Sequence, residues 1–221
     1  MQIEILPDGR LRHKRHVEVQ SLISELRALQ PISKVITSSE LLGYFDSELD
    51  FHPGHGAEGS RFEVRRNDPC EVAYQVLFAS PLARDERADL SVVHHSRGSI
   101  PLTKEALNAV HRDGEALTNQ ARQGHAVKVA TDRLTVTMMF PDAYRISECS
   151  PKLVVTLRDR VGDSSVAQKE LERICHSFKI RHNRLELDVE NPKLDHAYYF
   201  TWRPPSEDSL PEGLRMPELD V

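Results

Sequence analysis

The feature that most constrains the fold is an alternation of apolar and polar residues that recurs in separate segments. It runs through residues 70–78, 134–140 and 185–189. Successive side chains of a β-strand point to opposite faces of its sheet, so each segment predicts a strand with one buried face. An antiparallel meander is predicted where strands follow one another at short intervals, over residues 126–130, 134–140, 146–149 and 153–157.

Other segments of the chain show the spacing of an amphipathic helix. Val19, Leu22, Ile23, Leu26 and Leu29 lie on one face of a helix, which predicts a helix over residues 17–30. The same reasoning predicts helices over 103–123 and 165–178. We therefore expect an α+β fold, in which an antiparallel β-meander packs with amphipathic helices in one or two subdomains.

Two segments without hydrophobic periodicity, 50–60 and 80–103, are candidate boundaries. We expect an α+β unit over residues 1–100, a helix, meander and helix unit over 101–203, and a tail over 204–221. The tail holds four prolines, five acids and one arginine. Few apolar residues offset the entropy lost on ordering, which predicts an extended or mobile tail.

The charge balance limits the classes of partner. With 29 Lys and Arg against 34 Asp and Glu, the net charge of −5 disfavours a protein that grips nucleic acid with its whole surface. Nucleic acid could bind only through a local basic patch. The densest candidate comprises Arg10, Arg12, Lys14 and Arg15, and the even-numbered three share one face of an extended segment.

Cysteine use and hydropathy indicate the compartment. The three cysteines, Cys70, Cys149 and Cys175, show no CxxC spacing, so they predict neither a disulfide framework nor a thiolate zinc site. No apolar run is long enough to span a membrane. We expect a cytoplasmic protein without a membrane partner.

A histidine-rich segment is the strongest candidate for chemistry. Imidazoles on a glycine-rich loop and nearby carboxylates could hold a hydrolytic zinc or manganese ion. The candidate ligands are His52, His55, His94, Asp50 and Glu63. Neighbours in a strand point to opposite faces, so His94 and His95 could not both take part. The alternative interpretation is a polar loop that happens to be rich in histidine.

The same region resembles a nuclease pattern. Asp50, followed by Glu63-Val64-Arg65 on a predicted strand, is similar to the PD-(D/E)xK motif. That resemblance implies a Mg²⁺ ion held by the two acids. Arg65 replaces the lysine of the motif, and a guanidinium that is always protonated cannot accept a proton.

The last predicted strand concentrates aromatic residues. Tyr198, Phe200, Trp202 and the adjacent Arg203 are the residue types that dominate protein interfaces, so an exposed edge here predicts a partner-binding site. The alternative is that these rings complete the core.

Two functions follow as hypotheses. The first is a non-catalytic cytoplasmic binding or adaptor protein that acts through protein contacts, with the aromatic strand and the acidic tail as contact sites. The alternative is a metal-dependent hydrolase or nuclease that uses the histidine and carboxylate cluster with a divalent metal. The sequence singles out no catalytic residue, favours no cofactor, and leaves open whether the protein is an enzyme.

Overall fold

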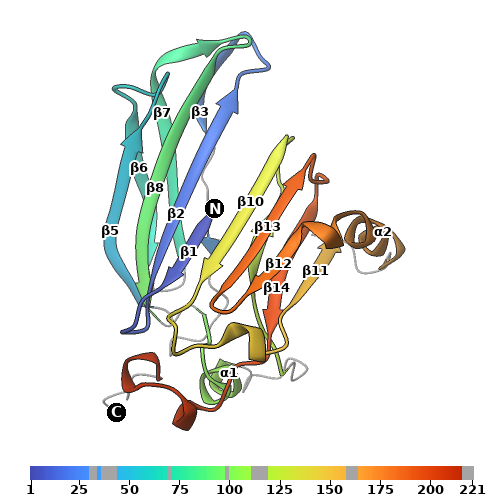
Figure 1. The fold of residues 1–221 in the computed structure, drawn as a ribbon. Helices are drawn as coiled ribbons and strands as arrows, with labels where there is room; N and C mark the ends of the chain where they lie inside the picture. Colours follow the sequence, from blue (N-terminus) through green and yellow to red (C-terminus); the bar gives the residue numbers. More distant parts are fainter. Residues whose placement is uncertain are drawn as a thin grey trace. The chain divides into compact units, whose positions relative to one another are not determined.

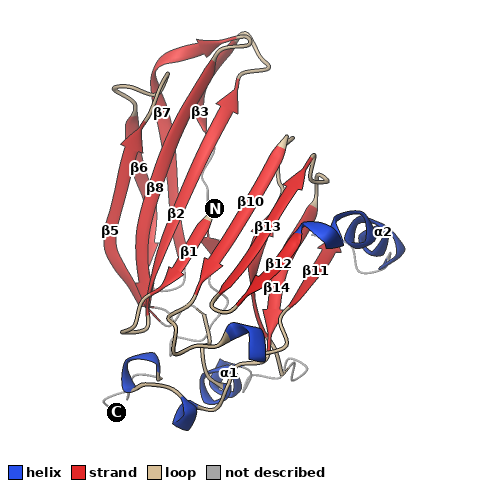
Figure 2. Ribbon diagram, viewed as in Figure 1, coloured by secondary structure: helices blue, strands red, loops and turns tan. Residues whose placement is uncertain are grey.

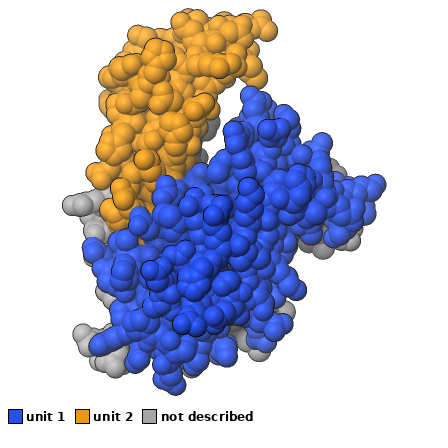
Figure 3. All heavy atoms as spheres, viewed as in Figure 1, with its two compact units in different colours: residues 1–10, 100–221 blue, residues 11–99 orange. Residues whose placement is uncertain are grey.

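β-strands make up most of the described chain (Figure 1, Figure 2), which contradicts the expected α+β fold with helices packed on a meander. The computed structural model describes residues 1–29, 34–35, 44–68, 71–97, 100–110, 119–157 and 164–215. These ranges contain two α-helices and divide into two compact units (Figure 3). Unit 1 comprises residues 1–10 and 100–221, and unit 2 comprises residues 11–99.

Unit 1 contains both α-helices and several short 3₁₀ segments. Its strands are β1 (Gln2–Ile5), β9 (Ala121–Ala126), β10 (Arg133–Met139), β11 (Lys152–Leu157), β12 (Phe178–Arg181), β13 (Arg184–Glu190) and β14 (His196–Trp202). Its helical segments are α1 (Lys104–Val110), η2 (Ile146–Glu148), α2 (Ser164–Ile174), η3 (Cys175–Ser177), η4 (Glu207–Ser209) and η5 (Glu212–Leu214).

The strands of unit 1 form two layers. One layer has the order β12-β13-β10-β1, in which β1 runs parallel to β10 and the other pairs are antiparallel. The second layer has the order β11-β14-β9. The rings of Phe178 and Phe200 stack with centroids 5.4 Å apart and join the layers, while Trp202 meets Phe140 edge-on at 5.8 Å. Aromatic packing of this kind stabilises a core beyond its buried area.

Unit 2 is likewise built from two layers of strands. Its strands are β2 (Arg10–Gln20), β3 (Glu25–Leu29), β4 (Lys34–Val35), β5 (Tyr44–Pro53), β6 (Arg61–Asp68), β7 (Glu71–Ala83) and β8 (Arg87–Arg97). One layer has the order β2-β8-β5. In the other, β7 pairs with β6 along one side and with β3 and β4 along the other.

The core of unit 2 lies between these layers. One apolar cluster joins Tyr74 and Val76 of β7 to Leu90 and Val92 of β8, and a second gathers around Phe78. Strand alternation explains the arrangement, because every second residue of β7 and β8 points into the same space.

The helix predicted over residues 17–30 is wrong. This segment contains the end of β2, a turn, and β3. Residues 10–16 are extended, as expected, but the strand continues through residues 17–20, where Val17 and Val19 alternate with polar residues. A strand, a turn and a second strand then reproduced helical spacing from Val19 to Leu29 by coincidence.

The helix predicted over 103–123 is also too long, whereas that over 165–178 is largely confirmed by α2. Helix α1 is described as far as Val110, residues 111–118 lie outside the described ranges, and β9 begins at Ala121. Gly124, the residue directly after the predicted helix, lies in β9. A Cβ atom at Gly124 would stand 1.9 Å from the carbonyl oxygen of Tyr198, so only glycine lets these two strands approach.

The expected meander does not form. The strand predicted before Leu134 is placed earlier, as β9, and it pairs with β14 rather than with β10. Residues 146–148 form a 3₁₀ turn instead of a strand. The divisions predicted at residues 100 and 203 stay predictions about domains, but residues 1–10 group with unit 1.

The segment expected to be an extended or mobile tail packs within unit 1 in its described part. Within the described part of that segment, Leu210 and Leu214 are buried. Residues 204–215 therefore pack against unit 1, and residues 216–221 lie outside the described ranges.

Candidate protein-contact site

Two of the predicted metal ligands lie on the outer face of β5. Leu49 and Phe51 point into the core of unit 2, so the alternating residues Asp50 and His52 point outward, and both are exposed. His55 lies in the turn after β5, where its side chain is largely exposed and its Nδ1 is 3.8 Å from Glu58 Oε1. These side chains face solvent.

His94 points the other way. Its ring stacks on that of His13, with centroids 4.4 Å apart and an angle of 5° between the planes. The nitrogen lone pairs lie in the ring planes, so two parallel stacked rings do not aim them at one ion. His94 is opposite Leu49 in the strand register, which places it on the interior side of the layer.

Glu63 lies on β6, in the other layer of unit 2, and is bonded to protein groups. It accepts hydrogen bonds from Arg61 and, at 3.0 Å, from Gln75 Nε2. Among the described residues, no three His, Cys, Asp or Glu side chains lie close enough to hold a metal. The structure thus does not bring the five candidate ligands together.

The aromatic strand β14 is central in its layer rather than an edge, and its rings are buried. Tyr198, Phe200 and Trp202 are each at most 1% exposed. The Trp202 Nε1 donates to the Tyr144 hydroxyl at 3.0 Å, and that hydroxyl donates to the Leu102 carbonyl at 2.9 Å. These rings complete the core of unit 1, so of the predicted set only Arg203 is exposed to a partner.

The basic segment divides between the two faces of β2. Arg12 and Lys14 are exposed on the outer face, as the alternation predicts, and Arg10 forms an ion pair with Asp8 at 2.6 Å. Arg15 points inward beside Tyr74, where burial lowers the pKa of its guanidinium. The predicted patch therefore loses one of its four members.

One arrangement on the outer face of β2 and β8 was not predicted from the sequence. Ser91 Oγ lies 3.1 Å from His16 Nδ1, and His16 Nε2 lies 3.4 Å from Glu18 Oε1. A hydroxyl, an imidazole and a carboxylate in sequence are the groups of a nucleophilic site. Here both the imidazole and the carboxylate are exposed, so water competes for each bond and the base has no fixed orientation.

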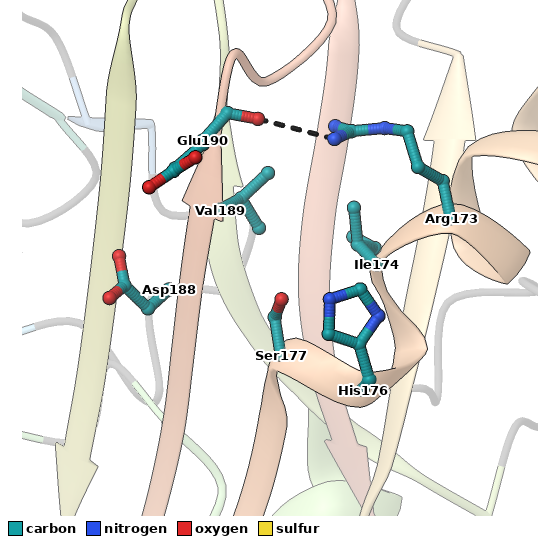
Figure 4. Close-up of a pocket in the computed structure, with 7 residues that line it drawn as sticks. All are labelled: Arg173, Ile174, His176, Ser177, Asp188, Val189 and Glu190. Atoms are coloured by element: carbon teal, nitrogen blue, oxygen red, sulfur yellow. Dashed lines mark hydrogen bonds between the residues drawn. The ribbon is translucent and has the colours of Figure 1, made fainter.

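Unit 1 contains an open depression of about 350 Å³ between the end of α2 and β13 (Figure 4). Its lining residues are Arg173, Ile174, His176, Ser177, Asp188, Val189 and Glu190. Arg173 carries a positive charge in this lining, but its guanidinium already donates hydrogen bonds to neighbouring protein groups. Nε and Nη2 donate to Glu170 at 2.8 and 2.6 Å, and Nη1 donates to the Glu190 carbonyl at 3.2 Å.

The Arg173 and Glu170 pair extends into the core. The Tyr198 hydroxyl donates to Glu170 Oε1 at 2.8 Å and accepts from the Lys193 backbone N–H at 2.8 Å. Burial raises the pKa of Glu170, but the hydrogen bonds from Arg173 and Tyr198 outweigh burial and the net shift is downward. This network joins α2 to β14 and to the turn after β13, so its role is structural.

The strongest candidate for a binding site is the turn between β2 and β3. Leu22 and Ile23 are adjacent there and are 69% and 55% exposed. Ser21, which precedes them, is buried, donates its N–H to the Glu86 carbonyl at 2.9 Å and accepts from the Asp85 N–H at 2.8 Å. Its hydroxyl also donates to the Ile23 carbonyl at 2.9 Å. Two apolar side chains are thus presented to solvent by a turn held in one conformation; we call residues 21–24 the apolar tip.

Unit 1 also has two exposed apolar residues in turns, but they lie in separate turns and are not adjacent in the sequence. Val129 and Leu194 are exposed in the turns after β9 and β13. These turns lie side by side, because the Asp195 N–H donates to the Val127 carbonyl at 2.9 Å. The sequence alone indicates neither place, because Leu22 and Ile23 fit the spacing of a helix core and isolated apolar residues in turns give no periodic signal.

Comparison with known proteins gives no family. No protein-family model matches the sequence, and no curated protein matches it. Among the described residues, neither helix has the length and hydropathy needed to cross a membrane.

Proposed function

We propose that the protein is a non-catalytic binding protein of the cytoplasm that acts through contacts with another protein. The observation that carries this proposal is the apolar tip, at which Leu22 and Ile23 are exposed on a turn held by Ser21. Exposed large apolar side chains lose free energy in water, and their burial against a partner recovers it.

The tip differs from other exposed apolar residues of the described chain. Val64 and Ile180 are also exposed, but each lies singly on a strand whose neighbours are charged. Single surface hydrophobes are normal in folded proteins. Two adjacent ones on a fixed turn lose little conformational entropy on binding, which favours association.

The surroundings of the tip favour a protein partner. Glu25 and Arg27 form an ion pair at 2.7 Å on the strand that follows the tip, and Arg84 and Asp85 lie in the turn bonded to Ser21. An apolar centre with a mixed-charge polar rim is the usual composition of a protein interface.

The test compares the double variant Leu22→Ser/Ile23→Ser with the matched control Val64→Ser/Ile180→Ser. Each protein is purified from its own cells at native level, and the co-purifying proteins are quantified by mass spectrometry. We expect one or more partners to be depleted about 10-fold with the tip variant, the effect of losing about 1.4 kcal/mol of binding energy. Equal recovery from both variants would contradict the proposal.

The metal-dependent hydrolase or nuclease stays an alternative hypothesis. No observation on the described residues favours it over the binding protein, and its direct test, metal analysis of the purified protein, is given below.

A further inference from the structure

A second surface is covered by the chain itself. Residues 204–215, which we call the strap, follow β14 without forming a strand and carry the short helices η4 and η5. Leu210 and Leu214 are the buried large apolar residues of the strap. Acidic residues Glu207, Asp208 and Glu212 lie between and before them.

The strap is attached to the start of α1 by polar contacts. The Lys104 N–H donates to the Pro205 carbonyl at 2.9 Å. Glu105 Oε2 accepts from the Glu207 N–H at 2.9 Å, and Oε1 accepts from the Ser206 hydroxyl at 3.2 Å. Burial raises the pKa of Glu105, but these hydrogen bonds, together with the Lys104 charge, lower it more. The carboxylate is therefore charged when it holds the strap.

Further along, the strap crosses the turn between β1 and β2 backbone to backbone. A Cβ atom at Gly213 would stand 2.5 Å from the Pro7 carbonyl oxygen, and one at Gly9 would stand 2.7 Å from the Gly213 carbonyl oxygen. Such close approach requires glycine on both sides. Because Gly213 has no side chain, the strap backbone can lie directly against the turn.

These attachments are few for a segment of this length. Three buried residues, Pro204, Leu210 and Leu214, and a small set of hydrogen bonds oppose the backbone entropy lost when the whole strap is ordered. Segments with few buried apolar contacts open locally more readily than the strands of a core.

We propose that the strap is releasable and that the surface beneath it, formed by residues 7–9 and the start of α1, is a peptide-binding surface. Its ligand is a segment with two leucines four residues apart and a glycine directly before the second. The strap is the occupant seen in the structure, and a segment of the same chemistry supplied in trans competes with it. This surface is separate from the apolar tip, and the inference does not depend on the proposed function.

The test uses a fluorescently labelled peptide of residues 204–221 and three full-length variants. Gly213→Ala and Leu210→Ser/Leu214→Ser are designed to release the strap, the first by steric clash and the second by loss of its anchors. Glu212→Ala, next to the glycine, is the control. Fluorescence of Trp202, the single tryptophan, which is buried in unit 1, reports whether that unit stays folded.

In both release variants we expect the strap amides, including that of Glu207, to exchange hydrogen about 10-fold faster than in the control. We also expect the labelled peptide to bind them about 10-fold more tightly than the native chain, because the competing strap no longer occupies the surface. A peptide with both leucines changed to serine should not bind.

Two results would overturn the inference. If both release variants lose the buried Trp202 signal, residues 204–215 are part of the core and not a strap. If unit 1 stays folded but the peptide binds the variants no better than the native chain, the covered surface is not a binding site.

Discussion

In unit 1 a group of buried aromatic and acidic side chains is joined by hydrogen bonds, whereas in unit 2 the interior-facing polar groups include a pair of stacked rings. Tyr144, Trp202, Tyr198 and Glu170 of unit 1 form directional hydrogen bonds of 2.8 to 3.0 Å. In unit 2 the rings of His13 and His94 stack at 4.4 Å. A hydrogen-bonded interior fixes one geometry, so removal of a single atom leaves a buried partner unsatisfied.

Unit 2 also has an ionisable group, Tyr74, within an apolar core cluster. Burial raises the pKa of Tyr74, and the nearby charge of Arg15 only partly offsets that rise. Two units of similar layered architecture thus rest on different interior chemistry. Each can be perturbed separately.

The largest effect is expected from truncating each core. Phe200→Ala in unit 1 and Leu90→Ala in unit 2 should each cost about 2–5 kcal/mol of unfolding free energy, because both side chains are fully buried. Urea unfolding is followed by Trp202 fluorescence and by circular dichroism. Phe200→Ala should lower the midpoint seen by fluorescence, and Leu90→Ala should lower only the circular dichroism transition.

A matched surface change, Ile180→Ala, should leave both midpoints unchanged. If Leu90→Ala moves the Trp202 transition as far as Phe200→Ala does, the two units unfold together and the comparison between them fails.

The next effect tests the hydrogen-bonded interior of unit 1. Tyr144→Phe keeps the ring but removes the hydroxyl that joins the Trp202 Nε1 to the Leu102 carbonyl. Two buried groups lose their partner, so we expect a loss of about 2 kcal/mol or more. The measurement is the urea midpoint of Trp202 fluorescence. A loss no larger than that of Tyr199→Phe, a partly exposed position on β14, would show that the bond contributes little.

A smaller effect with a definite pH dependence is expected for Glu170→Gln. Glutamine can still accept from Tyr198 but loses the charge that pairs with Arg173, and we expect a cost of about 1–2 kcal/mol at pH 7. The lower part of the usual range applies because the Arg173 side chain is 42% exposed and water screens the pair.

The direction with pH follows from the lowered pKa of Glu170. A carboxyl whose folded pKa lies below its ordinary value of 4.5 contributes stability above that value, and the contribution is lost as the pH falls through the folded pKa. The difference in unfolding free energy between the native chain and Glu170→Gln should therefore shrink below about pH 4.5. A difference that stays constant from pH 7 to pH 3 would mean that Glu170 is not the titrating group.

The sequence predicts strands wherever the alternation is purely apolar. Residues 134–140 and 185–189 became β10 and β13. It failed over residues 17–29, where the apolar residues at the end of β2, in the turn and in β3 fit helical spacing. Strand pairing could not be predicted from the sequence either. Strand β1 pairs with β10, more than 130 residues away, and β9 pairs with β14 instead of forming a hairpin with β10.

The candidate sites show a similar limit. Alternation correctly placed Arg12 and Lys14 on one face of β2, but residue type alone suggested that Tyr198, Phe200 and Trp202 were exposed. Burial of a strand depends on what covers each face, and a single sequence gives only the period. The apolar tip was missed for the converse reason, since two apolar residues in a turn look like part of a core.

The smallest effect is expected on the outer face of unit 2, where His52→Ala/His55→Ala removes two of the candidate metal ligands. Both imidazoles are exposed, so the unfolding free energy should change by less than about 0.5 kcal/mol. Elemental analysis of the native chain and the double variant after dialysis should give the same substoichiometric zinc and manganese content. Stoichiometric metal that disappears in the variant would require these histidines to move from their places on β5 and the following turn. It would then favour the hydrolase over the binding protein, because a bound ion lowers the pKa of its water toward neutrality and supplies a nucleophile.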